Sequence, residues 1–495
     1  MKQSQRIAKN ALAGGLSISV GGLLQLGTVV LVARHVSVAD FGAFSFMIAC
    51  EFVVFRLADC GISNILMRDL AVQPDITSDL LGAALSWAGL LSILTVVLTF
   101  SVVRLLRIQR TLGLMTLAMS LDGVGHFAAG CYGAVLLSRE DNELYAIGYI
   151  LHKVAILSLV TLSLILKFGL VGVIPAYIVG TLIQWGFYRW LVIKFYTRPN
   201  IKVDFALWKY LIANSVPVGG AGVLRLAAEQ ADVVILTWLL GIRAAGLFSG
   251  PYRIISGVRF LPMTVMISLY PLLARTAASP ASRPEFEEAY QRSVKLFALI
   301  AFPVAAVLAV CPDTLTVSLL GSSYKEAGTA TGLLSAGAWL MIMAQPFPFL
   351  LTALGRQRFL LTSSVIALAL RVGADLALVP ILNIAGPCVT VSISELTLIL
   401  VWMRDLRQFG FSLRLGSIIW RPCLAAVVMS AVLYLANPRS LLSLVCATVV
   451  SGLIYAGTAF QIGAISAGEL ELVKDGVGFL RVLLGAGRRL APGKV

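Results

Sequence analysis

The sequence predicts an all-α, polytopic membrane protein with about fourteen transmembrane helices. Three observations lead to this prediction: 59% of the 495 residues are hydrophobic, only 13% are charged, and apolar stretches about twenty residues long recur along the whole chain. An ordinary soluble domain carries about 25% charged residues, and a globule of this size needs a polar surface that this composition does not supply. Each apolar stretch is long enough to cross a hydrocarbon core about 30 Å thick as a helix.

Fourteen spans follow when the apolar stretches are taken in order. The first begins directly after a short basic segment, and its apolar run is too long for the core of a cleaved signal peptide, so we interpret it as an uncleaved span. The seventh and eighth spans exceed the length that a perpendicular helix needs and are expected to tilt or bend. The expected spans are 11–33, 41–62, 80–102, 112–137, 144–166, 170–194, 209–239, 245–273, 292–319, 328–352, 359–381, 385–403, 418–436 and 441–461.

The distribution of basic residues predicts that both termini lie in the cytoplasm. Lys and Arg are more frequent in the segments that are cytoplasmic in this topology than in the opposite loops, as the positive-inside rule requires. The net charge of +15 is therefore explained without a nucleic-acid partner. One group, Arg104, Arg107 and Arg110, falls outside in this topology as an exception to the rule, and we interpret it as a contact for an anionic partner.

A weak internal repeat suggests two similar halves. The segment that begins at Asn10 (NALAGG) resembles the one at Asn214 (NSVPVGG), and Phe41-Gly42-Ala43-Phe44-Ser45 resembles Ala245-Gly246-Leu247-Phe248-Ser249, at the same offset of 204 residues. The offset encloses six spans, so both copies would insert the same way up, as in transporters that work by alternating access. The expected division is a six-helix lobe at 1–200, a second at 201–410, two additional helices at 411–465 and a basic amphipathic tail on the membrane surface at 466–495.

The sequence contains no pattern typical of an enzyme or a metalloprotein. The seven cysteines are scattered singly, there are only three histidines, and no CxxC pair or nucleotide-binding GxxxxGK[ST] motif occurs. We therefore expect a transporter that is not an enzyme, without a cofactor, a metal site or direct use of ATP.

An ordered set of short motifs resembles one transporter family. The motifs are Asp40-Phe41-Gly42-Ala43-Phe44, Leu57-Ala58-Asp59-Cys60-Gly61-Ile62, Ala231-Asp232-Val233-Val234-Ile235-Leu236, Leu269-Tyr270-Pro271-Leu272-Leu273-Ala274, Gly321-Ser322-Ser323-Tyr324, Ala353-Leu354-Gly355-Arg356 and Asp375-Leu376-Ala377-Leu378-Val379-Pro380. Together they resemble the polysaccharide flippases of the MATE-like multidrug/oligosaccharidyl-lipid/polysaccharide exporter superfamily.

The resemblance implies a V-shaped, two-lobed fold and a substrate. The implied activity moves a lipid-linked oligosaccharide across the bacterial inner membrane for exopolysaccharide, O-antigen or capsule assembly. The resemblance also implies contact with membrane lipids and interaction with a polysaccharide polymerase and glycosyltransferases as partners.

Charged residues inside the expected spans are the candidate substrate site. A charge at the bilayer centre costs about 2.5–3.5 kcal/mol on insertion scales and should face a cavity or a partner. Because guanidinium groups bind phosphate oxygens bidentately, arginines in the second half could hold a lipid diphosphate, with carboxylates tuning the charge. The alternative is neutralised structural pairs or side chains that snorkel to an interface. The candidates are Arg225, Glu229, Asp232, Arg253, Arg259, Arg371 and Asp375.

A second group in the first half could couple transport to an ion gradient. Asp122 and His126 lie four residues apart in the fourth span, and Glu51 lies in the second. Histidine titrates near neutrality, so this group could relay protons.

Three other functions remain open at this stage. An antiporter for organic cations would have the same fold, although its site should be acidic and aromatic. A lipid II flippase is chemically close to the leading hypothesis and is not separated from it by sequence. A membrane-integral glycosyltransferase or polymerase is disfavoured because all expected outer loops are short.

Overall fold

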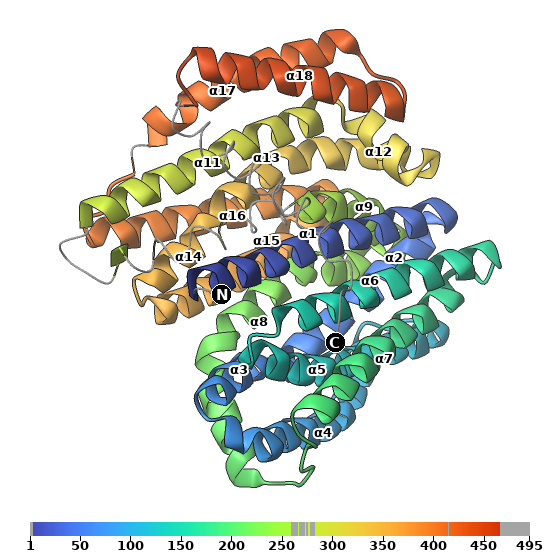
Figure 1. Ribbon diagram of the computed structural model, residues 1–495. Coiled ribbons are helices and arrows are strands. Elements are labelled where there is room, and N and C mark those ends of the chain that lie inside the picture. Colours follow the sequence, from blue (N-terminus) through green and yellow to red (C-terminus); the bar gives the residue numbers. More distant parts are fainter. Residues whose placement is uncertain are drawn as a thin grey trace, which may run out of the picture.

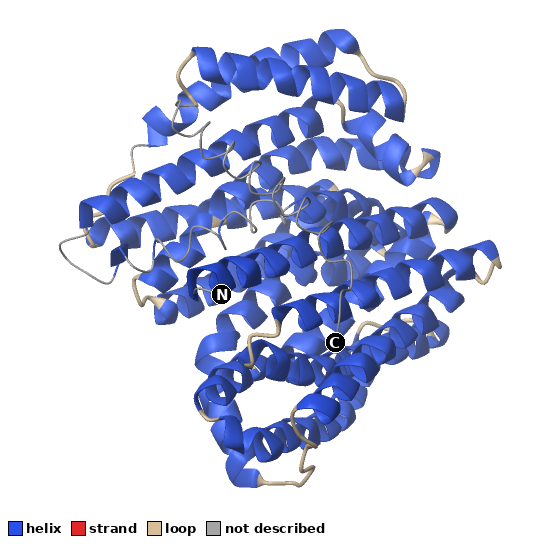
Figure 2. Cartoon of the chain, in the orientation of Figure 1, coloured by secondary structure: helices blue, strands red, loops and turns tan. Residues whose placement is uncertain are grey.

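The computed structural model describes residues 3–258, 283–413 and 415–465, together with Met266, Leu273, Thr276 and Ala277. Within these residues the chain forms helices and loops and no strand (Figure 2). The prediction of an all-α fold is confirmed. The expected tail at 466–495 lies outside the described residues.

Seven helices and one short 3-10 turn make up the first part of the chain. Cys60 and Gly61 separate α2 from α3 with positive φ angles of 37° and 91°, so the second expected span bends and continues to residue 72. The elements are α1 (Gln3–His35), α2 (Val38–Asp59), α3 (Ile62–Val72), η1 (Pro74–Ile76), α4 (Thr77–Leu105), α5 (Arg110–Ser138), α6 (Asn142–Ile165) and α7 (Gly169–Phe195).

The remaining helices begin with the longest one, which has 36 residues. The elements are α8 (Phe205–Leu240), α9 (Ile242–Val258), α11 (Arg283–Val310), α12 (Pro312–Leu320), η3 (Ser322–Ala327), α13 (Gly328–Ala344), α14 (Pro346–Ala353), α15 (Gln357–Leu382), α16 (Ala385–Gln408), α17 (Leu415–Ala436) and α18 (Leu441–Gln461). The eighth expected span ran to residue 273, and α9 is described only to Val258.

Twelve segments of the described chain are long and apolar enough to cross a membrane. They correspond to every expected span except the seventh and eighth, which contain α8 and α9. The multi-pass architecture is confirmed, and the count agrees approximately with the fourteen expected spans.

Two expected spans are broken where proline interrupts the backbone hydrogen bonds. The ninth span ends as α11 at Val310, and α12 starts anew with Pro312 at its first position. The tenth is divided into α13 and α14, again with a proline, Pro346, at the first position of the second piece. Proline lacks the N–H that a continuing helix needs, but it fits the first turn of a new one.

The helices pack in layers (Figure 1). The helices α3, α4, α5 and α7 lie in the lower part of the view, α1 lies in the middle, and α17 and α18 lie at the top, where α17 packs on α11. In the middle, α2 packs on α5 of its own half and on α8 and α9 of the other. Two apolar clusters, one around Phe44 and Leu247 and one around Phe46 and Phe248, contain residues of both halves.

Two glycines bring the backbones of α2 and α9 into direct contact. The carbonyl oxygen of Ile242 lies over Gly42, and the carbonyl oxygen of Val38 lies over Gly246, so a methyl group at either glycine would overlap the facing oxygen. Gly42 and Gly246, like Val38 and Ile242, are separated by 204 residues, which is the offset of the sequence repeat. The contact is therefore reciprocal, as a two-fold relation between α2 and α9 requires.

A second close contact joins the other end of α2 to α8. Gly61 lies against the backbone of Gly219 and Ser215, and a side chain at Gly219 would overlap the carbonyl group of Cys60. Tyr210, one turn before Ser215 on α8, donates a hydrogen bond to Asp69 of α3 at 2.7 Å. The α2 helix is thus held to the second half of the chain at both of its ends.

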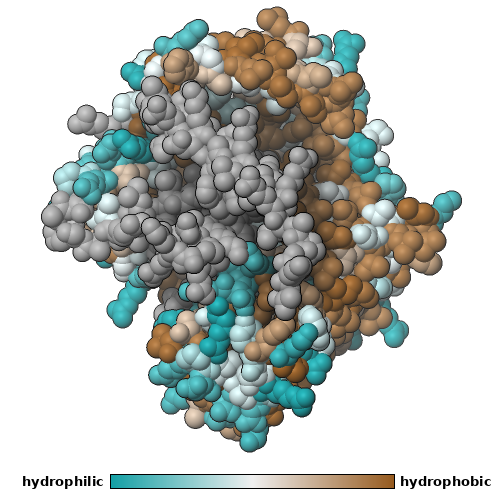
Figure 3. Space-filling model, viewed as in Figure 1, coloured by the Kyte–Doolittle hydropathy of each residue, from teal (hydrophilic) through white to brown (hydrophobic). Residues whose placement is uncertain are grey.

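The surface has the polarity of a membrane protein. On the face seen in Figure 3, hydrophobic residues cover the right-hand side and hydrophilic residues gather at the lower end. Large apolar side chains of the outermost helices are exposed, for example Leu435 at 82% on α17 and Leu442 at 75% on α18. Such exposure is favourable in lipid and unfavourable in water.

The glycine contact predicts an unusual response to alanine. Alanine usually stabilises a helix by about 0.5–1 kcal/mol relative to glycine, but Gly42→Ala should destabilise the protein by about 1–3 kcal/mol because the helices must move apart. The matched control is Gly89→Ala on α4, where nothing lies within 4 Å of the added methyl group. Thermal unfolding midpoints of the two variants in detergent test this, and equal midpoints would contradict the backbone contact.

Candidate functional site

The most buried ion pair among the described residues joins Asp232 of α8 to Arg371 of α15, with Tyr252 of α9 beside it. The Arg371 Nε donates to Asp232 at 2.8 Å, and one of its terminal nitrogens donates to the second Asp232 oxygen at 2.6 Å. The same terminal nitrogen donates to the Tyr252 hydroxyl at 3.2 Å. The side chains of Arg371 and Asp232 are 2% and 0% exposed, so the pair is bidentate and shielded from solvent.

Asp375 lies one turn from Arg371 on the same helix and is fully buried. It interacts electrostatically with Asp232 and Arg371. The Asp232 carboxylate and the Thr390 hydroxyl of α16 are its hydrogen-bonding neighbours. Asp375 and Thr390 therefore extend the pair of Arg371 and Asp232 into a small buried polar network.

Arg225 is the more accessible guanidinium of this cluster. It lies 3.6 Å from Glu229 on its own helix and 3.6 Å from Glu395 on α16, and it stands over the ring of Trp402 at 5.8 Å. Its side chain is 23% exposed, whereas that of Arg371 is 2% exposed. The two arginines therefore differ in both the tightness of pairing and exposure.

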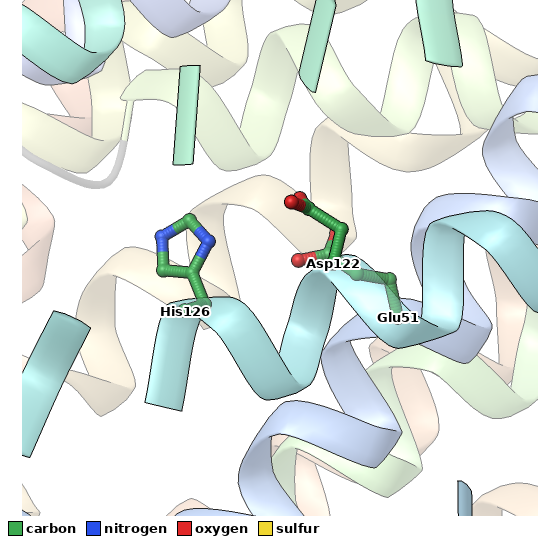
Figure 4. Close-up of side chains that lie close together, drawn as sticks. All are labelled: Glu51, Asp122 and His126. Atoms are coloured by element: carbon green, nitrogen blue, oxygen red, sulfur yellow. The ribbon is translucent and has the colours of Figure 1, made fainter. Parts of the chain in front are cut away.

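The three residues predicted for coupling lie together in the first half of the chain. Oxygen or nitrogen atoms of Glu51, Asp122 and His126 are within 4.8 Å of one another (Figure 4). Thr181 of α7 donates a hydrogen bond to Asp122 at 3.2 Å and lies 3.4 Å from the Nδ1 of His126. Sequence reasoning selected these three residues, but it had no means of placing α2 beside α5.

His152 and Lys153, both on α6, complete this first-half cluster. The ring of His152 lies 4.8 Å from that of His126, and neither of its nitrogens has a hydrogen-bond partner among the described residues. Lys153 donates to Gln25 of α1 at 3.0 Å and interacts electrostatically with Glu51. The geometry of Glu51, Asp122 and His126 could hold a cation, but Lys153 already supplies positive charge there, which disfavours a divalent metal ion.

Arg253 belongs to the first-half cluster and not to the one around Arg225. From α9 it reaches across to α2, where its guanidinium lies 3.4 Å from both the hydroxyl and the carbonyl oxygen of Ser45 and 5.9 Å from the ring of Phe44. It also interacts electrostatically with Glu51. The candidate residues thus form two groups, and Arg253 ties the second half of the chain to the first-half group.

The sequence prediction missed one carboxylate of the site. Glu395 is 2% exposed and is the second partner of Arg225. The sequence could have identified Glu395, because it is the single acidic residue within the apolar span 385–403. Arg259, also a candidate, lies outside the described residues.

Comparison with known proteins places the chain in a family. Residues 7–277, more than half of the chain, match a family model described as "Polysaccharide biosynthesis protein". The chain belongs to this family. No curated protein matches it.

Solved transporters have the same fold as this family member. The lipid II flippase MurJ in an inward closed conformation aligns with a TM-score of 0.71 and 14% identity over 92% of this chain and 99% of that chain. An inward-facing multidrug resistance MATE transporter of the MOP superfamily aligns at 0.67 and 16% identity, over 82% of this chain and 98% of the other. A MOP superfamily transporter from Pyrococcus furiosus, described as having a binding pocket of reverse polarity, aligns at 0.59 and 15% identity over 83% and 98%. These neighbours are transporters and a flippase, not enzymes.

The buried pair predicts a large loss of stability when one partner is removed. Arg371→Leu leaves the Asp232 carboxylate buried without its cation and should cost about 3–5 kcal/mol. The matched control is Arg292→Leu on α11, whose pair with Glu288 is 66% and 62% exposed and should contribute less than about 1 kcal/mol. Unfolding in detergent measures both.

A double variant tests whether the uncompensated charge of Asp232 is the cause of this loss of stability. If the uncompensated charge is the cause, Asp232→Leu in the Arg371→Leu background should restore much of the stability. A double variant that is no more stable than the single one would contradict this explanation.

Proposed function

We propose that the chain is a flippase that moves a polyprenyl-diphosphate-linked oligosaccharide across the bacterial inner membrane by alternating access, for exopolysaccharide, O-antigen or capsule assembly. The observation that carries the proposal is Arg225, a partly exposed guanidinium among buried charges, in a member of a polysaccharide biosynthesis family with a flippase-like fold.

Arg225 is suited to a diphosphate because its present partners are loosely held. Separations of 3.6 Å to Glu229 and Glu395 are longer than the roughly 2.7–2.9 Å of a strong charge-assisted hydrogen bond. A phosphate oxygen that displaced Glu395 would make a shorter contact with the same guanidinium. The exchange would also release the tie between α8 and α16, which gives substrate binding a route to a change of conformation.

The other candidates of this cluster take supporting roles in the proposal. Arg371 and Asp232 hold α8 and α15 together, and Glu229 fixes the position of Arg225. Asp375 and Thr390 remain as polar groups that can bind a sugar hydroxyl or a small cation. Arg259 is retained as a candidate for the diphosphate on the basis of sequence alone.

The first-half cluster is proposed as the site of ion coupling. Binding of a proton or a monovalent cation near Glu51 and Asp122 would reduce the negative charge that faces Lys153 and Arg253. Because Arg253 comes from α9, this change would weaken a contact between the two halves of the chain.

The proposal also includes the membrane topology of the chain and its partner proteins. Both termini lie in the cytoplasm, the two six-helix lobes comprise 1–200 and 201–410, and 411–465 adds two helices with a surface-bound tail at 466–495. The flippase works beside a polysaccharide polymerase and glycosyltransferases, which consume and supply its substrate.

A cation antiporter is the second candidate, and the charge balance favours it. Around Arg225 and Arg371 the described residues include four carboxylates, Glu229, Asp232, Asp375 and Glu395, so the formal balance is 2 − 4 = −2. An acidic site attracts organic cations. A lipid II flippase remains a third possibility, supported by the similarity in fold.

The flippase proposal predicts a defined effect of Arg225 variants. In liposomes that carry a fluorescent polyprenyl-diphosphate oligosaccharide, Arg225→Ala should slow its protein-dependent translocation about tenfold or more, because a hydrogen bond to a charged group contributes about 1.5–3 kcal/mol. Arg225→Lys should retain part of the rate. Protection from a membrane-impermeant quencher measures translocation.

The control is Arg243→Ala, which removes a pair with Glu326 that is 60% and 63% exposed. It should translocate at the wild-type rate. No translocation by the wild type, together with gradient-driven efflux of an organic cation, would replace the flippase by the antiporter.

The coupling proposal predicts that Asp122→Asn uncouples transport from a gradient. The wild-type rate should rise when a proton or sodium gradient is imposed, and the variant should show the same rate with and without it. Asp75→Asn, an exposed carboxylate in η1, is the control and should keep the response. A variant at Asp122 that still responds fully would remove the first-half cluster from coupling.

A further inference from the structure

A pocket of about 440 Å³ opens between α4 and α7, with α5 as its floor. It is separate from the cluster around Arg225, touches the first-half cluster only at Thr181, and is lined mainly by apolar side chains. The lining includes Ala128, Tyr132, Thr181, Leu182, Trp185 and Arg189. Its size falls in the range of small-molecule sites, about 300–1,000 Å³.

The pocket faces the surroundings of the protein and not its core. Leu182, which lines the pocket from α7, is 53% exposed. It belongs to a span long enough to cross a membrane. The solvent that meets the opening is therefore lipid hydrocarbon.

The two ends of the pocket differ in polarity. At one end Arg189 is exposed, and its guanidinium lies 5.3 Å from the ring of Trp185 and interacts with Tyr132. At the other end Thr181 is 1% exposed and its hydroxyl already donates to Asp122. Between them the walls offer few hydrogen-bond partners, so ordered water, which needs two to four polar partners, fits poorly.

Further basic residues follow Arg189 and add positive charge at the same end of the pocket. Lys194 follows on α7, and Arg198 and Lys202 follow in the segment that leads to α8. Basic residues at the end of a span attract anionic lipid headgroups, at about 1 kcal/mol for each Lys or Arg near the surface. An apolar pocket open to lipid with a cationic end has the chemistry of one lipid chain and its phosphate.

We propose that this pocket binds one acyl chain of an anionic glycerophospholipid of the bilayer, with the phosphate at Arg189. The end of the acyl chain would lie against Thr181, which donates a hydrogen bond to Asp122. The lipid composition of the bilayer would therefore affect the first-half cluster through the side chain of Thr181. The proposal is independent of what the protein transports.

Trp185 makes the site measurable, because brominated acyl chains quench tryptophan fluorescence on contact. The protein is reconstituted in vesicles that contain brominated phosphatidylglycerol or brominated phosphatidylcholine, and the contribution of Trp185 is the difference between wild type and Trp185→Phe. We expect phosphatidylglycerol to quench this contribution with about fivefold higher apparent affinity. Arg189→Gln should abolish the preference, and Arg189→Lys should keep it.

Two further variants keep the test decisive. Lys194→Gln removes the same charge from the same helix, but its side chain stacks on Trp190 and does not line the pocket, so the preference should persist. Ala128→Leu fills the pocket and should reduce quenching of Trp185 by both lipids.

Three results would overturn the proposal. They are equal quenching by both lipids in the wild type, an equal loss of preference in Lys194→Gln and Arg189→Gln, and displacement of brominated phosphatidylglycerol by a substoichiometric amount of a polyprenyl diphosphate. The last result would assign the pocket to the transported lipid.

Discussion

The close approach of α2 to α8 and α9 is the constraint on which the rest of the structure depends. At Gly42 and Gly246 no side chain separates the backbones, and the same holds where Gly61 meets Gly219. Small residues allow such approaches between membrane helices, where packing replaces the hydrophobic effect as the source of affinity. Because α2 also carries Glu51, its position fixes the first-half cluster relative to Arg253 of α9.

The buried charges are arranged around this central contact in two groups that differ in kind. The pair of Arg371 and Asp232 is bidentate, short and shielded, so exchange of one partner for a ligand would expose a charge to a low-dielectric surrounding. Arg225 is partly exposed and shares two carboxylates at longer distances. The same residue type therefore supports structure at Arg371 and is available for binding at Arg225.

Much of the fold followed from the sequence because lipid imposes length and polarity on every span. The apolar stretches predicted the helices well, and the misjudged positions were those where proline or a positive φ angle interrupts a span, as at Pro312 and at Cys60. The site was only partly accessible. Ionisable residues inside spans identified Arg225, Asp232 and Asp122 one by one, because their cost in lipid makes them conspicuous. Which of them pair depends on helix packing, so sequence grouped Arg253 with Arg225, whereas the structure places it beside Ser45 and near Glu51.

The charge balance sharpens the choice between an anionic and a cationic substrate. In the second half, each described guanidinium of the cluster already has a carboxylate partner, so a diphosphate gains little from net potential and must compete with a carboxylate. Such competition is feasible at Arg225, where both ion pairs are long, and is unfavourable at Arg371, where both hydrogen bonds are short. An organic cation has the opposite requirement, since it needs a carboxylate that an arginine does not already hold. Asp232 accepts both short hydrogen bonds of Arg371, whereas the hydrogen-bonding neighbours of Asp375 are Asp232 and Thr390, so a cation would depend on Asp375. The two substrates therefore depend on different residues of one cluster, Arg225 for the anion and Asp375 for the cation.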